Sequence, residues 1–243
     1  MRRRLLPGLL AGGAIVAPSP AGTPAWAATA ARAEAETAAA LFGAVVGSLS
    51  EPAALETAFR SYYAFRAARP DLVRQPLLYF VDYGLPADRP RGWIFDMVAL
   101  RVIEGPFMVA HGRGSSADSH GIPTRFSNRR GSQASSLGLF LGRETYAFRG
   151  RMGGRAYRSI GLRLEGLSGQ MNDNALARRV VAHGAPYVTG DRAGRSEGCP
   201  AMEPARAERL LPRLADGGLV FLFSPAADLM KNEPWAARSA LSR

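Results

Sequence analysis

The residues with the clearest chemical potential are a histidine and a cysteine, His183 and Cys199, sixteen positions apart. His183 ends the run Val180–Ala182 and is followed by Gly184, so a loop can expose its imidazole. Cys199 stands between a glycine and a proline, where a tight turn can present a side chain and direct backbone N–H groups to the same point. Such a pair is the minimum for thiol acyl transfer: the imidazole takes the proton, the thiolate attacks a carbonyl, and amides hold the oxyanion.

Cys199 is the only cysteine in the chain, so it forms no intramolecular disulfide. Free cysteine is among the most buried residue types, and a lone thiol and imidazole are therefore compatible with a purely structural role. On these two residues alone, structure would come before catalysis. The residues around them reverse that order.

Short sequence blocks occur in a fixed order across the chain and resemble the signature of the L,D-transpeptidases, the YkuD-type cysteine enzymes of bacterial peptidoglycan. The closest resemblance is to the murein L,D-transpeptidase catalytic domain subfamily, and it runs from about Leu77 to Phe223. The blocks are Val109-Ala110-His111-Gly112, Phe126-Ser127-Asn128, Gly131-Ser132 with Ser135-Ser136-Leu137-Gly138, Leu162-x-Leu164-x-Gly166-Leu167, Asn172-Asp173-Asn174-Ala175, Val181-x-His183-Gly184-Ala185-x-Tyr187-Val188 and Gly194-Arg195-Ser196-x-Gly198-Cys199-Pro200-Ala201.

The resemblance implies a catalytic role for four residues. Cys199 would be the nucleophile and His183 the base, Ser196 and a backbone carbonyl would orient the imidazole, and N–H groups around Gly198 and Cys199 would form the oxyanion hole. In the family, the thiol attacks the bond between the third residue of a tetrapeptide stem and its terminal D-alanine. The thioester then passes to an amine or to water, and no metal or cofactor is required.

Four more residues are candidates for substrate binding. His111 lies in a second His-Gly at the end of a strand, although a satisfied structural histidine is at least as good an interpretation. Ser136 could donate to substrate, yet paired serines before a strand are ordinary turn chemistry. Tyr187 could wall the acyl pocket or simply pack. Arg195 is either a pocket cation or a solvated loop residue.

Two positions depart from the family pattern. Glu197 stands where the wider family has the histidine of Ser-His-Gly-Cys, and Ala201 stands where it usually has an arginine. Arg195 is the candidate to replace that arginine. A carboxylate turned toward the thiol would raise the pKa of Cys199 and weaken the nucleophile. We therefore expect Glu197 to point outward, toward solvent or toward a cation such as Arg195.

Two rival interpretations come from other classes. His111 and Asp118 loosely resemble the first zinc motif of D,D-dipeptidases, but the later histidines, His120 and His183, lack the context of the second motif. The other rival is a non-catalytic wall-binding protein that keeps the fold. A thiol-reactive probe that labels Cys199 at neutral pH would favour the enzyme.

The N-terminus has the three parts of a secretory signal peptide. Arg2–Arg4 are followed by the apolar stretch Leu5–Val16 and by Ala25-Trp26-Ala27, a small-x-small cleavage site. We place cleavage after residue 27, with the export route, general secretory or twin-arginine, left open. The mature protein is expected in the periplasm or outside the cell, with no stable membrane anchor.

The chain is basic, with a formal net charge of +11, and all but one of its 31 basic residues are arginine. Residues 1–27 contain three arginines and no acidic residue, so their removal leaves +8. No dense basic run with interleaved aromatics is present, which argues against nucleic acid. The charge suits a substrate rich in carboxylates, such as the stem peptides of peptidoglycan, but genomic base composition explains the many arginines equally well.

The order of elements predicts a mainly β fold, an L,D-transpeptidase-like antiparallel β-sandwich or barrel with short helices and a helical N-terminal segment. Leu77–Tyr83, Gly92–Val98 and Val102–Ala110 are β-branched and aromatic runs divided by Pro and Gly. We expect a helical segment over 28–70, a catalytic domain over 71–225 and a loosely held tail over 226–243.

Overall fold

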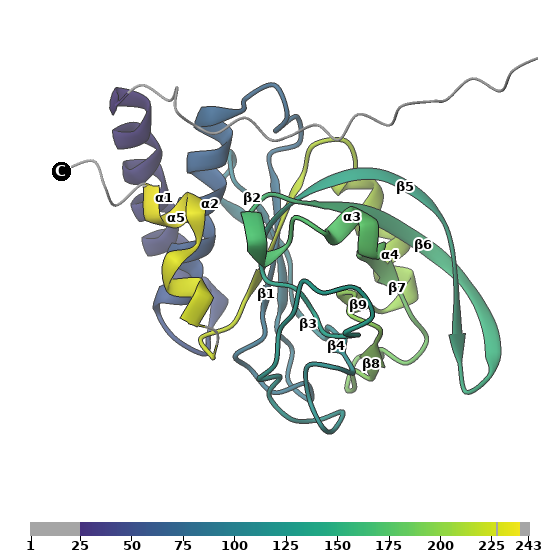
Figure 1. Ribbon diagram of the computed structural model, residues 1–243. Helices are drawn as coiled ribbons and strands as arrows, with labels where there is room; N and C mark the ends of the chain where they lie inside the picture. The colour runs from purple at the N-terminus through teal and green to yellow at the C-terminus, as the bar shows by residue number, and fades with distance from the viewer. Residues whose placement is uncertain (1–24, 227, 239–243) are drawn as a thin grey trace, which may run out of the picture.

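The computed structural model describes residues 25–226 and 228–238 (Figure 1). Two helices come first, α1 (Ala25–Val46) and α2 (Ala53–Ala68), and they pack against each other. The buried positions of α1 recur every three or four residues, at Ala31, Ala35, Ala38, Phe42 and Val46. This is the period of one helix face, and it confirms the helical character predicted for the N-terminal segment.

The predicted signal segment lies outside the described residues, except for its last three positions, with which α1 begins. The cleavage point after residue 27 and the export of the protein therefore stay predictions. None of the described helices combines the length and the apolar character needed to cross a membrane.

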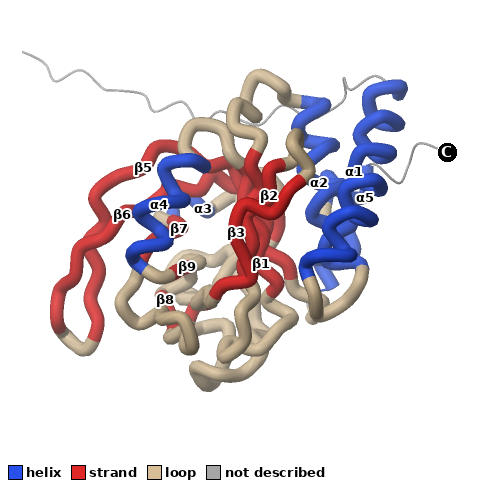
Figure 2. The backbone as a smooth tube through the Cα atoms, turned by 180° about the vertical axis from the view of Figure 1, so that it is seen from behind, coloured by secondary structure: helices blue, strands red, loops and turns tan. Residues whose placement is uncertain are grey.

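Within the described residues the main sheet has eight strands in the order β3-β2-β1-β10-β5-β6-β7-β9. The central strands β1 and β10 are buried at every position, and helices α1, α2 and α5 lie together on one side of this sheet (Figure 2). The strand bounds are β1 Leu77–Asp82, β2 Gly92–Asp96, β3 Arg101–Phe107, β5 Gly138–Met152, β6 Arg155–Gly166, β7 Val181–Gly184, β9 Ala201–Met202 and β10 Leu219–Phe223. A separate pair joins β4 (His111–Gly112) to β8 (Arg195–Ser196).

The sheet-rich class with short helices is as predicted, but the pairing differs in part. Strands β1 and β10 pair in parallel, as do β7 with β9 and β4 with β8. Short hairpins force antiparallel neighbours, whereas strands joined by long connections are free to pair in either direction. The expectation of a wholly antiparallel arrangement was wrong because it rested on local spacing alone.

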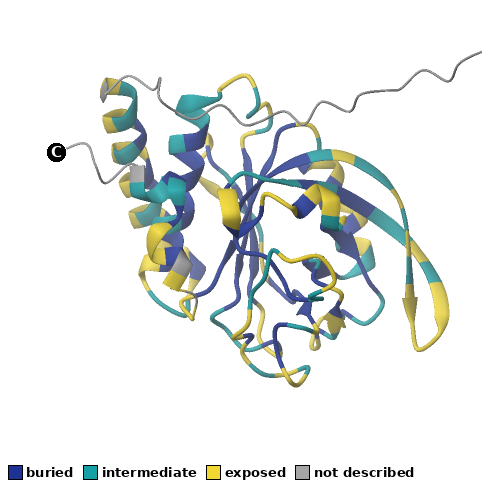
Figure 3. Cartoon of the chain, viewed as in Figure 1, coloured by how far each residue is buried: buried dark blue, intermediate teal, exposed yellow. Residues whose placement is uncertain are grey.

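The longest element is the hairpin of β5 and β6, whose strands turn at Gly153 and Gly154. Both glycines have positive φ, +56° and +80°, which suits a two-residue hairpin turn. The base of the hairpin belongs to the sheet, while its distal half projects from the body of the domain and is largely exposed (Figure 3). The distal half of this hairpin is therefore accessible to solvent.

Two further helices flank the site, α3 (Ala175–Arg178) and α4 (Pro204–Leu214), and α4 packs on β6 and β7. The C-terminal segment corrects the prediction of a loosely held tail. It forms a 3₁₀ turn (Asp228–Asn232) and α5 (Pro234–Arg238), which packs on α2. Glu233 is fully buried there and accepts hydrogen bonds from the hydroxyls of Ser61, at 2.5 Å, and Ser168, at 2.6 Å.

Candidate active site

Cys199 sits in a turn between β8 and β9 that one serine hydroxyl holds in shape. The Ser196 hydroxyl donates to the carbonyl oxygen of Cys199 at 2.7 Å and accepts the N–H of Gly198 at 3.1 Å. Gly198 has φ +122°, and a Cβ on it would lie 2.8 Å from the carbonyl oxygen of Ala134. Ser196 therefore braces the nucleophile turn, and its role in orienting the imidazole stays a prediction.

The second His-Gly block lies directly beneath this turn, because β4 pairs in parallel with β8. A Cβ on Gly112 would lie 2.7 Å from Cα of Gly198 and 2.3 Å from the carbonyl oxygen of Gln133. The Gly112 N–H donates to the hydroxyl of Ser135 at 3.0 Å. Only a residue without a side chain fits between the nucleophile turn and the loop that carries Ser135.

His183 lies in β7, the strand beside the nucleophile turn. Its N–H donates to the carbonyl oxygen of Pro200 at 3.2 Å, and it pairs with Ala201 across to β9. The imidazole is buried and stacks on the ring of Phe148, with centroids 4.2 Å apart and planes at 20°. Residues from β7 and from the β5–β6 hairpin thus bring the imidazole to the edge of the turn that holds Cys199.

The hydrogen bond of the imidazole fixes its tautomer. Nδ1 of His183 lies 3.0 Å from the carbonyl oxygen of Gly184, and because a carbonyl only accepts, Nδ1 carries the hydrogen. Burial lowers the pKa of His183 from 6.5 to about 4, with the Gly184 hydrogen bond opposing this. At neutral pH the ring is uncharged, and Nε2 holds a lone pair that can accept a proton.

The thiol of Cys199 is half-buried and lies 4.0 Å from the carbonyl oxygen of Arg179, to which it donates. Burial raises the pKa of this thiol. A hydrogen bond with the Val181 backbone and the charge of Arg178 oppose the rise, while Glu197 adds to it. The pKa changes of Cys199 and His183 both favour the uncharged forms, so at neutral pH Cys199 is a thiol and the imidazole is neutral.

Arg178, at the end of α3, is a site residue that the sequence analysis missed. Its guanidinium lies 3.4 Å from where a Cβ on Gly198 would be, and it donates to the carbonyl oxygens of Ser127, at 2.6 Å, and Ala134, at 2.7 Å. No carboxylate among the described residues forms an ion pair with it. The signal that could have found it is its position three residues after the Asn172–Ala175 block.

Ser136 and Arg195 have supporting roles in the structure. The Ser136 hydroxyl accepts from Arg178 and donates to the carbonyl oxygen of Ser127 at 3.2 Å, so it fixes the loop beside the nucleophile. Arg195 donates to the carbonyl oxygens of Ser116, at 3.1 Å, and Ala117, at 2.9 Å. It holds the loop over 115–121 in place and does not supply the missing family arginine.

Glu197 points outward, as expected, with 75% of its side chain exposed. Its partner is Arg113, at 2.8 Å, and not Arg195. Arg195 is not available to Glu197, because its guanidinium already donates to the carbonyl oxygens of Ser116 and Ala117.

His111 is fully buried behind the nucleophile turn. Its Nδ1 accepts from the guanidinium of Arg91 at 2.8 Å, and burial together with that charge lowers its pKa to about 3. Its Nε2 has no protein partner among the described residues. His111 is thus neutral, with one ring nitrogen unpaired within the described residues, and its role in substrate binding stays a prediction. Nowhere in the described chain do three His, Cys, Asp or Glu side chains gather to hold a metal ion.

Tyr187 belongs to an aromatic wall that the sequence analysis recognised only in part. Its ring meets Tyr157 edge to face, with centroids 6.4 Å apart. Tyr146, Tyr157 and Tyr187 all lie within electrostatic reach of the Cys199 thiol, and burial raises the pKa of each. Tyr146, Phe148 and Tyr157 come from the β5–β6 hairpin, so this hairpin forms one side of the site.

Residues 48–223 match the family model described as "L,D-transpeptidase catalytic domain". The chain belongs to this family. The match covers every sequence block that surrounds His183 and Cys199, and it includes α2 as well as the sheet. No curated protein matches the chain.

Solved L,D-transpeptidases are similar at low identity. One from Mycobacterium smegmatis is 14% identical over 61% of this chain and 59% of its own, with a TM-score of 0.37. One in complex with imipenem is 13% identical over the same shares, with a TM-score of 0.37. One from Stackebrandtia nassauensis is 12% identical over 81% of this chain and 93% of its own, with a TM-score of 0.38. The chain thus spans about three-fifths of the first two.

Proposed function

We propose that this protein is an exported enzyme that uses Cys199 and His183 for acyl transfer at the third residue of a peptidoglycan tetrapeptide stem. Family membership supports the reaction class. The observation that carries the assignment is the bond from Nδ1 of His183 to the Gly184 carbonyl, because it leaves Nε2 as an uncharged base beside the thiol turn.

In the first half of the reaction, Nε2 of His183 takes the thiol proton as sulfur attacks the carbonyl carbon of the third stem residue. The C–N bond to the terminal D-alanine then breaks, and the imidazolium returns its proton to the leaving amine. The product is a thioester on Cys199. In the second half, an amine or a water molecule attacks the thioester, His183 removes the proton of that nucleophile, and the thiol is regenerated.

The oxyanion of the tetrahedral intermediate needs a backbone donor beside the sulfur. The N–H of Gly198 already donates to the Ser196 hydroxyl, at 3.1 Å. Within the described residues the N–H of Cys199 itself donates to no protein acceptor, and we assign it to the oxyanion. This refines the sequence-based expectation, which named both amides.

Arg178 takes over support of the acyl pocket from the arginine that the wider family has at the position of Ala201. It holds the 127–136 loop through four hydrogen bonds, to Ser127, Ser132, Ala134 and Ser136, and brings a positive charge to the thiol turn. Arg195, the candidate from the sequence, is occupied elsewhere.

The deciding experiment is incubation with purified muropeptides that contain tetrapeptide stems, followed by mass analysis. New dimers show transpeptidation, a shortened stem shows carboxypeptidation, and cleaved dimers show endopeptidase action. Cys199→Ser is the control, because all three products require the thiol. If the wild-type chain changes none of these substrates, the proposal is wrong.

Two further measurements test the proposal independently. Because a family structure was solved with imipenem, the wild-type chain should gain the mass of that molecule at Cys199, and Cys199→Ser should not. For export, N-terminal sequencing of the protein from the cell envelope should begin at Ala28. A protein recovered with Met1 intact from the cytosol would contradict export without touching the chemistry.

A further inference from the structure

The outer face of the β5–β6 hairpin carries a cluster of arginines, Arg149, Arg151 and Arg158, which we call the outer arginines. Residues alternate between the two faces of a strand. Phe148 faces His183, so its neighbour Arg149 and then Arg151 point to the opposite face. Arg158 pairs directly with Arg149 across the hairpin and therefore shares its face.

This arrangement is electrostatically unfavourable in the isolated protein. Like charges directly opposite each other across an antiparallel pair destabilise it. Residues 145–158 contain four arginines and no acidic residue. None of the outer arginines forms an ion pair or a side-chain hydrogen bond within the described chain, and all three are exposed. By contrast, Arg143 and Arg163 at the base of the same hairpin pair with Glu165 and Glu144.

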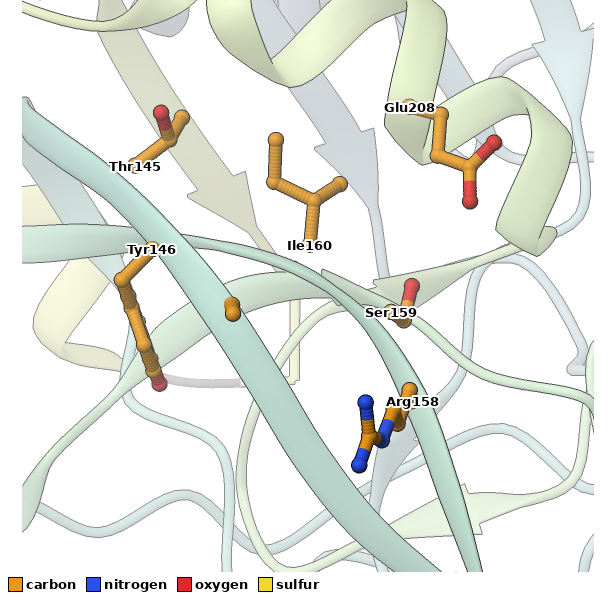
Figure 4. Close-up of a pocket in the computed structure, with 7 residues that line it drawn as sticks. Thr145, Tyr146, Arg158, Ser159, Ile160 and Glu208 are labelled. Carbon is orange, nitrogen blue, oxygen red and sulfur yellow. The ribbon is translucent and has the colours of Figure 1, made fainter.

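A hollow adjoins the outer arginines where the hairpin meets α4. It has a volume of about 470 Å³, and its lining residues from the hairpin are Thr145, Tyr146, Ala147, Arg158, Ser159 and Ile160 (Figure 4). Glu208 of α4 is the one carboxylate among the lining residues, and it forms no ion pair with Arg158. The outer arginines therefore adjoin an open hollow at the junction of the hairpin and α4.

We propose that the outer arginines form a second binding surface for the acidic stem peptides of polymeric peptidoglycan, separate from the stem that reacts at Cys199. This inference rests on the proposed function, because that function places a carboxylate-rich polymer at the site. The inner face of the hairpin walls the thiol with Tyr146, Phe148 and Tyr157. When one stem of the polymer occupies the site, the polymer runs past the hairpin. The carboxylates of its neighbouring stems then lie near the guanidinium groups of the outer arginines.

The surface would act by avidity. A polymer held at the outer arginines raises the effective concentration of its stems at the thiol, without any new contact at the reacting bond. Binding through exposed charges weakens with ionic strength, since the Debye length falls to about 3 Å in 1 M salt. We therefore expect the outer arginines to matter for insoluble peptidoglycan and not for a single soluble stem.

The test measures co-sedimentation of the full chain with purified sacculi, in a Cys199→Ala background so that no chemistry intervenes. The triple variant Arg149→Gln, Arg151→Gln and Arg158→Gln should bind about tenfold more weakly, as three exposed ion pairs allow. The control variant Arg74→Gln, Arg89→Gln and Arg213→Gln removes the same charge from exposed positions elsewhere and should bind like its parent. The triple lysine variant of the outer arginines keeps the charge and should retain most of the binding.

Turnover of a soluble disaccharide-tetrapeptide, in chains with Cys199 intact, should be the same in wild type and in the glutamine variant. This arm separates the two proposals: no turnover by wild type counts against the proposed function, whereas equal sacculus binding by both glutamine variants counts against the outer arginines. Vesicles of phosphatidylglycerol and phosphatidylcholine provide the last comparison. Arginine-dependent binding to these vesicles and not to sacculi would overturn the assignment to peptidoglycan in favour of an anionic lipid surface.

Discussion

Replacing Phe148 by alanine should raise the pH at which activity is lost on the acidic side. The Phe148 ring covers the imidazole of His183 at a centroid distance of 4.2 Å, and burial lowers the pKa of His183 from 6.5 to about 4. That lowering corresponds to about 3 kcal/mol against the protonated ring. Removing the ring admits water to one side of the imidazole, so the pKa of His183 should rise toward 6.5.

The sign follows from the role of His183 as a base. Above the pKa the ring is neutral and accepts the thiol proton, and below it the ring is protonated and inactive. Wild type should therefore keep most of its activity at pH 5. A variant in which the pKa of His183 is near 6 would keep about a tenth of its plateau rate at pH 5. At pH 8 the two proteins should differ much less.

The same lowering also affects stability. The unfolded chain binds a proton at His183 below about pH 6.5, whereas the folded chain does so only near pH 4. Folding stability is thus undiminished by this group above pH 6.5 and decreases as the pH falls from there toward 4. Circular dichroism at each pH must show that the protein is folded where rates are compared.

The assay is the pH profile of kcat/KM together with an NMR titration of the histidine Cε1–H resonances. His183→Gln assigns the resonance, and the chain contains only two other histidines. Phe107→Ala is the matched control, since Phe107 is a buried ring on β3, at the far end of the sheet from β7. It should cost stability without moving the acid limb. An acid limb near pH 6.5 in wild type, or an unchanged limb in Phe148→Ala, would refute the reasoning.

Three other substitutions give sharp expectations. Cys199→Ser should abolish turnover and leave thermal unfolding nearly unchanged; retained turnover would contradict the thiol mechanism. Arg178→Gln should shift alkylation of Cys199 by iodoacetamide to higher pH, because it removes the charge that opposes burial of the thiol, and an unshifted profile would count against it. Gly112→Ala should cost about 1–3 kcal/mol in urea denaturation and reduce turnover, because its Cβ would lie 2.7 Å from Cα of Gly198. Gly190→Ala, with open space around the added Cβ, should change neither.

The parts of the fold that the sequence predicted are those that depend on local patterns. Leu77–Asp82 and Gly92–Asp96 form strands because β-branched and aromatic residues alternate with Pro and Gly turns. The pairing of β1 with β10 could not be predicted from the sequence, because it joins residues more than 130 positions apart and no turn signal connects them. The packing of the C-terminal segment depends in the same way on Glu233 and on its distant partners Ser61 and Ser168.

The residues of the candidate site also differ in how far the sequence could predict them. Cys199 and His183 were predicted because the short sequence blocks around them resemble the family signature, whereas residue type and spacing alone favoured a structural role. Arg178 acts through backbone carbonyls of the 127–136 loop, and its position just after the Asn172–Ala175 block is the one sign of it in the sequence. The aromatic wall depends on Phe148 meeting His183 and on Tyr157 meeting Tyr187, which are contacts between separate segments that no local pattern predicts.

The electrostatics of the pair indicate when the proton moves. Burial raises the pKa of the Cys199 thiol and lowers that of the His183 imidazole, so both changes favour the neutral pair over the thiolate–imidazolium pair. An enzyme with a preformed ion pair would react with any small electrophile near neutral pH. Here the proton must leave as sulfur bonds to carbon, and only a carbonyl held near both sulfur and the oxyanion donor stabilises that step. The neutral ground state therefore makes Cys199 slower toward small electrophiles near neutral pH than a preformed ion pair would be. The positive charge of Arg178 lowers the free energy needed to form the thiolate, because it stabilises negative charge as it develops on sulfur.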